Sequence, residues 1–324
     1  MHENMKYMPL LITGMILIMS SSCTRENETQ IQREQEQRFF NIYRARNYPD
    51  AQIRSSGLHY AEHREGQGAS PDRDDWVLVN HVSYTIPEDN VFESYVEEVA
   101  LDNQFFDSAA LYGPYKMQNG TRNEGLTEGL TLMKEGGQYT FLFTSELGYG
   151  TSGSGDINPY TSLKYEVELL EVITDINAYE QAKVDAYVDT IPDADTVLET
   201  GLNIPMYYII DRPGDGDFIV DDSVVEIAYK GYLVDGRVFD QATVEDPFEF
   251  SFGEEDLILG WDLGLPRLRE GDKARFVIPY QLGYGVEEQI DPGTGFRTIP
   301  PYETLLFDIE VLAVKSEPGG VKEK

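Results

Sequence analysis

The stretch from residue 225 to residue 312 decides the fold. It contains VEIAYKGYLVDGRVFD (225–240), FEF (248–250), LILGWDLGL (257–265), QLGYG (281–285) and TIPPYETLLFDIEVL (298–312). Aromatic residues recur near the ends of runs in which apolar and polar residues alternate, and a single tryptophan, Trp261, follows Gly260. No one of these segments is rare, so their order along the chain carries the information.

The last of these runs has a period of two. Its polar face holds Asp308 and Glu310, and a similar run at residues 163–169 alternates in the same way. Such alternation is typical of antiparallel strands with one buried face. The apolar face of the run holds Leu305, Phe307, Ile309 and Val311.

The chain repeats itself. GLTEGL at residues 125–130 parallels GWDLGL at residues 260–265, and LGYG occurs at both 147–150 and 282–285. The spacing also agrees, because Tyr149 follows Gly125 by 24 residues and Tyr284 follows Gly260 by 24. The sequence therefore predicts one module that occurs twice.

In this order, the segments of the second copy resemble those of the FKBP-type peptidyl-prolyl isomerases. The resemblance implies an α+β protein with two FKBP-like domains joined by a helical linker. Each domain would be an antiparallel β-sheet wrapped around a short helix, near residues 261–268 in the second copy. It also implies an apolar, aromatic-walled groove that isomerises X-Pro bonds of proline-containing polypeptides and that could accept macrolide inhibitors. No cofactor and no metal are implied.

The resemblance assigns roles to residues of the second copy. Trp261 would form the floor under a bound proline ring. The backbone N–H of Ile258 and the hydroxyl of Tyr284 would donate to substrate carbonyls, and Asp240 stands where the family has an acidic residue facing the pocket. The walls, rim and entrance would be formed by Tyr229, Phe239, Phe250 and Phe307 (walls), Phe248 (rim), and Leu257 and Ile299 (entrance). The loop 286–297 is longer and more acidic than in the shortest family members and would overhang the groove, where it would affect substrate preference.

The first copy keeps part of this pattern. Tyr84, Phe92 and Tyr149 match it, Glu93 replaces the aspartate, and Tyr165 stands where the second copy has Phe307. However, the floor tryptophan is replaced by Leu126, and Arg122 and Asn123 occupy entrance positions where apolar residues are expected. A charged Arg122 beside an apolar groove costs desolvation unless it points outward or pairs. An insertion separates Phe92 from Tyr115 by 23 residues, against 9 from Phe239 to Phe248. We therefore expect weak or absent isomerase activity here, or a different binding role.

Composition excludes some partners. The 324 residues carry a formal net charge of −33, so nucleic acid is excluded as a partner on electrostatic grounds. One cysteine and four histidines argue against a structural zinc site, even though His59 and His63 are close in sequence.

The N-terminus has the pattern of an export signal. Lys6 precedes the apolar run 10–19, which is too short to span a bilayer, and SSS precedes Cys23. Small residues before a lone cysteine resemble a bacterial lipoprotein cleavage site, so Cys23 is the predicted lipidation site and a lipid anchor would be the only membrane contact. An ordinary secretory peptide with an incidental cysteine is the alternative. The lipoprotein interpretation predicts a lipid-anchored protein of the bacterial cell envelope, at the periplasm or the outer-membrane surface.

The predicted organisation has seven parts. Helical periodicity is expected at 38–46, with Phe39, Ile42 and Tyr43 on one stripe, and at 175–190, whereas 193–203 is acidic and expected to be irregular. The boundaries are a lipoprotein signal peptide (1–22), a polar tether (23–38), an N-terminal helical segment (39–56), a degenerate FKBP-like domain (57–173), a helical linker (174–203), the isomerase domain (204–315) and a tail (316–324). The rival to an isomerase is a non-catalytic protein that holds proline-containing or unfolded segments.

Overall fold

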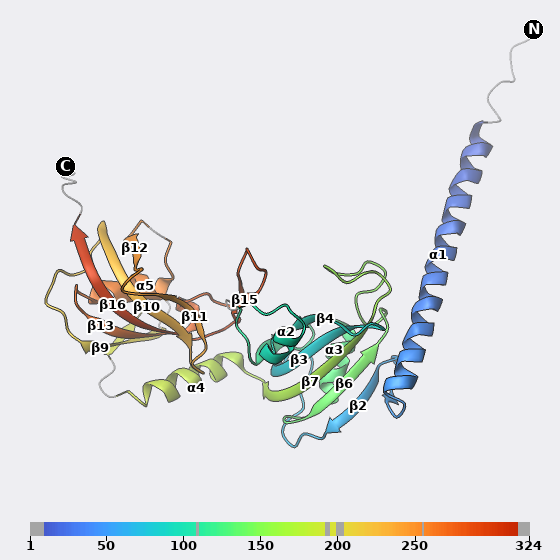
Figure 1. The fold of residues 1–324 in the computed structure, drawn as a ribbon, viewed down its shortest axis with the longest axis horizontal. Coiled ribbons are helices and arrows are strands. Elements are labelled where there is room, and N and C mark those ends of the chain that lie inside the picture. Colours follow the sequence, from blue (N-terminus) through green and yellow to red (C-terminus); the bar gives the residue numbers. More distant parts are fainter. Residues whose placement is uncertain (1–9, 108–109, 192–194, 199–203, 255, 317–324) are drawn as a thin grey trace, which may run out of the picture. The chain divides into compact units, whose positions relative to one another are not determined.

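The computed structural model describes residues 10–107, 110–191, 195–198, 204–254 and 256–316, with side chains from Asn27 onward except at 195–198 and 316. Residues 1–9 of the expected signal peptide, the side chain of Cys23 and residues 317–324 of the tail lie outside this description. The chain forms two compact units (Figure 1). The first comprises Met1–Asp74, Val79–Ser94 and Asn119–Val172, and the second comprises Asp75–Leu78, Tyr95–Gln118 and Ile173–Lys324.

Helix α1 spans Leu10–Asn47 and runs through the segment for which a tether was expected. Residues 24–38 contain no proline or glycine and are rich in glutamate, glutamine and arginine, which have high helix propensity. The predicted apolar stripe is wrong at two positions, because Phe39 and Ile42 are 53% and 56% exposed. Tyr43 is buried as predicted, and Phe40 is buried in place of Phe39, in one cluster with Ile86 and Leu142 of the first unit.

One buried carboxylate fixes this helix to the first unit. Glu36 accepts hydrogen bonds from the backbone N–H of Ser145 at 2.6 Å, the hydroxyl of Ser145 at 2.8 Å and the hydroxyl of Ser162 at 2.9 Å. Three donors satisfy the buried carboxylate, which would otherwise be costly to bury. Among the helices within the described residues, none is both long and apolar enough to cross a membrane.

The first sheet has seven strands in the order β1-β2-β6-β7-β3-β4, with β5 paired to β3. The pairings β1–β2, β2–β6, β6–β7 and β3–β4 are antiparallel, as the alternation predicts. Helix α3 (Glu124–Thr131) belongs to the first unit, whereas α2 (Glu97–Asp102) lies in the segment that groups with the second unit. The strands are β1 (Gln52–Ile53), β2 (His59–Arg64), β3 (Trp76–Ile86), β4 (Asn90–Ser94), β5 (Tyr115–Gln118), β6 (Gln138–Phe143) and β7 (Ser162–Ile173).

The second sheet repeats this arrangement, with the order β11-β10-β16-β13-β9-β8 and β12 paired to β10. Helix α5 (Leu259–Gly264) and a 3-10 turn, η1 (Leu265–Arg267), form the short helix that was expected near 261–268. The strands are β8 (Asp195–Leu198), β9 (Pro205–Arg212), β10 (Ser223–Leu233), β11 (Val238–Ala242), β12 (Phe248–Ser251), β13 (Lys273–Ile278) and β16 (Leu305–Ser316). A 3-10 turn η2 (Tyr280–Leu282) and a small hairpin, β14 (Gln289–Ile290) and β15 (Arg297–Ile299), precede β16.

Two segments lie between the two sheets in the sequence, the linker helix and residues 193–203. The linker helix α4 (Ile176–Val188) is confirmed, and the side chain of Asp175 caps it by accepting from the N–H groups of Asn177 and Ala178. Its Val184 packs with Val277 and Leu306, which alternate with residues of the main core, so α4 covers the opposite face of the second sheet. Within 193–203, which was expected to be irregular, β8 pairs with β9.

Both sheets hold their short helix at close range through two glycines four residues apart. A Cβ added at Gly260 would lie 2.5 Å from Ile278, and one at Gly264 would lie 2.6 Å from Phe276. In the first unit, Gly125 and Gly129 approach Phe143 and Phe141 in the same way, at 2.5 and 2.9 Å. The repeat seen in the sequence is therefore a repeated packing contact between helix and strand.

We predict that Gly264→Ala lowers the free energy of unfolding of the second unit by about 1–3 kcal/mol, the usual cost of overpacking a core. The loss would occur even though alanine is the better helix former. Urea unfolding, read out for β13 by pulsed hydrogen exchange, measures it. The exposed Asp262→Ala in the same helix is the control and should change stability by less than about 0.5 kcal/mol. Equal stability of Gly264→Ala and the unmodified protein would contradict the close-packing argument.

Candidate active site

The residues predicted for the groove of the second copy converge from five elements. Tyr229 lies on β10, Phe239 and Asp240 on β11, Phe248 and Phe250 on β12, Trp261 on α5 and Phe307 on β16. Strand β10 runs between β11 and β16, so its Gly231 faces Asp240 on one side and Phe307 on the other. A Cβ at Gly231 would lie 2.7 Å from Phe239 and 3.0 Å from Phe307. The absent side chain lets these two rings meet edge to face across the strand, with centroids 5.6 Å apart.

Trp261 is the centre of the aromatic cluster, which we call the aromatic cup. Its ring centroid lies 5.1 Å from Phe307 and 5.2 Å from Tyr229, both edge to face. Phe248 and Phe250 lie at 6.2 and 6.4 Å. These separations fall in the range in which aromatic pairs stabilise one another beyond simple burial. The indole N–H of Trp261 is buried and has no hydrogen-bond partner among the described residues.

Burial is graded across the aromatic cup. Phe250, Trp261, Ile299 and Phe307 are at most 5% exposed, whereas Tyr284 is 41% exposed. The partly buried side chains packed against the same core are Tyr229, Phe239, Phe248, Leu257 and Ile258. The cup therefore has a closed base and a side open to solvent, and the geometry brings together every apolar residue that the sequence assigned to it.

The two tyrosine hydroxyls at the open side of the cup are hydrogen-bond donors. The Tyr229 hydroxyl donates to Asp240 at 2.5 Å, and burial together with this carboxylate raises the pKa of Tyr229. Burial and the negative charge of Asp240 also raise the pKa of Tyr284. Both phenols therefore stay protonated at neutral pH. Ile258 caps α5, and its N–H donates to no other group in the described part of the chain.

Comparison with known proteins identifies the family. The sequence model described as FKBP-type peptidyl-prolyl cis-trans isomerase matches residues 73–170 and 216–312, more than half of the chain. The chain belongs to this family.

Three relatives illustrate the similarity. The peptidyl-prolyl cis-trans isomerase FKBP15-2 of Arabidopsis thaliana is 44% identical over 31% of this chain and 58% of its own length. FkpA of Escherichia coli strain K12 is 37% identical over 35% of this chain and 39% of its own length. FK506-binding protein 1 of Saccharomyces cerevisiae is 42% identical over 32% of this chain and 90% of its own length. The chain spans about half the length of the first curated relatives that it matches, 58%, 44% and 42%.

Solved structures of the family are also similar. The crystal structure of FkpA from Escherichia coli aligns with a TM-score of 0.38 at 23% identity, covering 51% of this chain and 70% of that one. The three FKBP domains of wheat FKBP73 align with a TM-score of 0.34 at 19% identity, covering 82% of this chain and all of that one.

Strand register corrects one sequence alignment between the two FKBP-like copies. Ser83 pairs with Glu93 as Gly231 pairs with Asp240, which places His81, not Tyr84, at the position of Tyr229. Tyr84 instead corresponds to Tyr232: its hydroxyl donates to Glu166 at 3.1 Å, as that of Tyr232 donates to Asp308 at 3.0 Å. Strand pairing was needed to find His81, because the hairpin of the first copy is one residue longer, and counting back from Glu93 by the spacing of the second copy would reach Val82.

The first copy fills its groove with paired charges. Arg122 contacts the carboxylate of Glu93 at 2.8 Å, so it pairs, as its position beside an apolar groove required. The ring of His81 lies 3.3 Å from the same carboxylate. Burial alone would raise the pKa of Glu93, but the hydrogen bond to His81 and the charge of Arg122 outweigh it and lower the pKa to about 2. Tyr165 is buried, and its hydroxyl accepts from Asn123 at 2.8 Å. Polar groups thus stand where the second copy has an apolar base.

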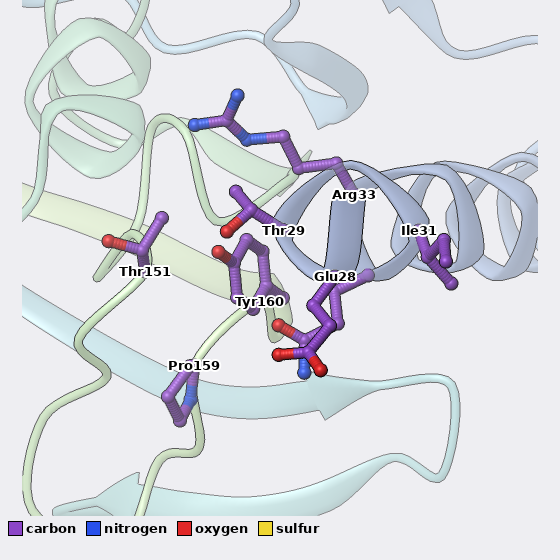
Figure 2. Close-up of a pocket in the computed structure, with 8 residues that line it drawn as sticks. Glu28, Thr29, Ile31, Arg33, Thr151, Pro159 and Tyr160 are labelled. Atoms are coloured by element: carbon purple, nitrogen blue, oxygen red, sulfur yellow. The ribbon is translucent and has the colours of Figure 1, made fainter. Parts of the chain in front are cut away.

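The first unit also contains an open cleft of about 700 Å³ between α1 and the loop 151–160. Glu28 and Arg33 of the helix and Tyr160 of the loop line it, and Figure 2 shows the two charged side chains pointing apart. The lining has a single aromatic ring and no converging set of donors, so it lacks the features of the aromatic cup.

We predict that Glu93→Gln removes a pH-dependent part of the stability of the first unit. The folded-state pKa of Glu93 is about 2, below the ordinary 4.5, so its contribution is complete above pH 4.5 and is lost as the pH falls towards 2. The shift corresponds to about 3 kcal/mol. Urea unfolding of β6 and β7, read by pulsed hydrogen exchange at one labelling pH, should show a large difference between variant and parent at pH 7 that shrinks by pH 2–3. The exposed Glu88→Gln is the control. A difference that is the same at both pH values would refute the assignment.

Proposed function

We propose that the second FKBP-like copy catalyses the cis–trans isomerisation of X-Pro peptide bonds in polypeptides. The observation that carries this is the aromatic cup, in which Trp261 meets Tyr229 and Phe307 edge to face beneath an open side. Rotation about the bond faces a barrier of about 18–20 kcal/mol set by amide resonance. The twisted amide has less charge separation than the planar one, so an apolar surrounding disfavours the planar ground state. A thousandfold acceleration requires only about 4 kcal/mol, and neither a nucleophile nor a cofactor is needed.

The roles follow from the position of each group. The proline ring would lie on Trp261 between Tyr229, Phe239, Phe250 and Phe307. The Ile258 N–H and the Tyr284 hydroxyl would donate to carbonyls on either side of the bond, and Asp240 would orient the Tyr229 hydroxyl that it accepts from. Phe248, Leu257 and Ile299 would line the rim and entrance. Preorganised donors of this kind favour the transition state because they need no reorganisation during the reaction.

We predict that Trp261→Leu, which gives the second copy the residue of the first, lowers kcat/KM for a chromogenic X-Pro tetrapeptide at least about tenfold, or about 1.4 kcal/mol. The full chain is assayed, and circular dichroism checks the fold. Leu259→Ala, a partly exposed position on the same helix, serves as the matched control and should retain activity within about twofold. Full activity of Trp261→Leu would sink the account of the aromatic cup.

A second candidate function is a holding role for the first copy. Its floor residue is Leu126, and its groove carries the paired Glu93 and Arg122, a poor environment for favouring a twisted amide. The first copy would then bind unfolded or proline-containing segments without isomerising them. Trp261→Leu separates the two roles. If the variant still suppresses the aggregation of a denatured protein but no longer isomerises X-Pro bonds, the two copies have different functions. If the variant loses isomerisation and the suppression of aggregation together, both functions belong to the second copy.

We further propose that the chain is an exported lipoprotein of the bacterial cell envelope, with residues 1–22 removed and Cys23 acylated. The sequence pattern before Cys23 supports this, and FkpA of Escherichia coli strain K12 is one of the relatives. The domain boundaries 57–173 and 204–315 are proposed as the two copies, and macrolides as ligands of the second.

We predict that Cys23→Ser abolishes incorporation of a clickable palmitate analogue and moves the protein from the membrane to the soluble fraction of a bacterial host. Ser22→Ala, which keeps a small residue before the cysteine, is the control and should still be labelled. Continued labelling of Cys23→Ser would show that the cysteine is incidental.

A further inference from the structure

The insertion of the first copy belongs to the second unit. Residues Tyr95–Gln118 lie within the first copy in sequence, yet they group by contacts with Ile173–Lys324. Leu111, 3% exposed, lies in the same hydrophobic cluster as Trp261 and Ile299. We call residues 95–118 the clamp segment; residues 108 and 109 within it lie outside the description.

The clamp segment holds the β14–β15 hairpin through Arg297. The N–H of Leu111 donates to the carbonyl of Arg297 at 3.0 Å, and the guanidinium carbon lies 4.1 Å from the ring centroid of Tyr95 and 4.3 Å from that of Tyr115. Arg297 is 1% exposed, and none of its three guanidinium nitrogens has a hydrogen-bond partner among the described residues. Two aromatic faces are thus the main compensation for its burial. Ile299, to which the sequence assigns the entrance of the aromatic cup, is two residues further along the same strand.

The clamp segment also contacts the turn that leads into a wall of the cup. Arg237 donates to the carbonyl of Tyr112 at 2.9 Å. It lies in the turn before β11, two residues ahead of Phe239, which forms a wall of the cup. Gly113 has a φ of +114°, and its missing side chain leaves room for the Arg237 guanidinium, which a Cβ would approach to 2.9 Å. The segment therefore touches the turn before the strand of Phe239 and the strand that holds Ile299.

A buried charge cluster fixes the end of the clamp segment. The ammonium group of Lys116, 2% exposed, lies 2.6 Å from Glu180 of α4 and 3.5 Å from Glu303. Lys183 contacts the same two carboxylates at 3.2 and 2.9 Å, which balances the charges. Lys116 also donates to the carbonyl of Tyr302 at 3.1 Å. Removing one member of such a set leaves an uncompensated buried charge, so the cluster fixes the position of the segment strongly.

We propose that the clamp segment is a specificity element of the isomerase site: by holding Arg297 and Arg237 it sets the distance between the entrance at Ile299 and the wall at Phe239. This inference rests on the proposed function of the aromatic cup. Arg297 is a positioning residue, because it acts through Ile299 and does not touch the reacting bond. A rim held in one position selects substrates by the size of the residue before proline. A mobile rim would accommodate residues of different sizes equally well.

The test uses the full chain with Arg297→Met, which keeps the apolar length and removes the charge. The substrates are tetrapeptides with alanine, leucine or phenylalanine before proline. The ratio of the highest to the lowest kcat/KM should fall at least threefold, while the value for the best substrate changes less than twofold. A loss of folded protein would instead lower all three values equally. Arg237→Met, at the other contact, should act in the same direction if Arg297→Met does not fold.

The matched control is Arg269→Met. Its guanidinium also lies on an aromatic ring, 3.9 Å from the centroid of Phe218, but Arg269 is exposed. It should leave the ratio unchanged. An unchanged ratio in both Arg297→Met and Arg237→Met, or no size preference in the unmodified protein, would overturn the proposal.

A second readout separates this proposal from the proposed function. Hydrogen exchange of residues 289–299 should accelerate at least tenfold in Arg297→Met and stay unchanged in Arg269→Met, whether or not the protein is an isomerase. Faster exchange in a protein without isomerase activity would refute the proposed function and leave the clamp contact standing. Unchanged exchange in an active enzyme would refute the clamp alone.

Discussion

The close approach of a short helix to the central strands is the constraint on which each FKBP-like copy depends. Glycines at 260 and 264 bring α5 against Ile278 and Phe276, and Trp261, between them, is thereby set among the rings of Tyr229 and Phe307. The same spacing in the first unit sets Leu126 at the equivalent place. What distinguishes the two copies is therefore not the scaffold but the residue that the scaffold presents and the groups around it.

The two grooves illustrate opposite uses of an acidic residue. Asp240 accepts from a tyrosine and leaves the surrounding rings apolar, whereas Glu93 is enclosed by a histidine and an arginine whose interactions lower its pKa to about 2. A firmly charged carboxylate with a paired guanidinium favours polar ligands and polar conformations of a peptide. The exchange of one floor residue is thus accompanied by a change in the electrostatics of the whole groove.

Much of this could be predicted from the sequence, and the failures have physical causes. The order of aromatic and glycine segments predicted the fold class and the members of the aromatic cup, because these contacts repeat within one module. The buried face of α1 was predicted correctly at Tyr43 but wrongly at Phe39 and Ile42, because Phe39 and Phe40 are adjacent and only Phe40 shares the helix face of the buried Glu36 and Tyr43. Tyr84 was matched by residue type, and His81 was missed because the hairpin of the first copy is one residue longer, so that only the strand pairing places His81 at the position of Tyr229. The role of residues 95–118 could not be foreseen, because their anchors Lys116 and Arg297 are residue types that are normally exposed.

The second unit is built from three separate segments of the chain, and this affects the order in which the protein folds. The first unit needs nothing beyond Val172, so it can form while the remainder is still being synthesised. The second cannot, because Lys116 must wait for Tyr302, 186 residues later. Contacts of such sequence separation form slowly, and until they form, a lysine and a leucine destined for the interior remain in water. A fragment beginning after residue 173 would lack Leu111 from its core altogether. In this chain the second unit is therefore completed last, and only with a segment that was synthesised long before the rest of it.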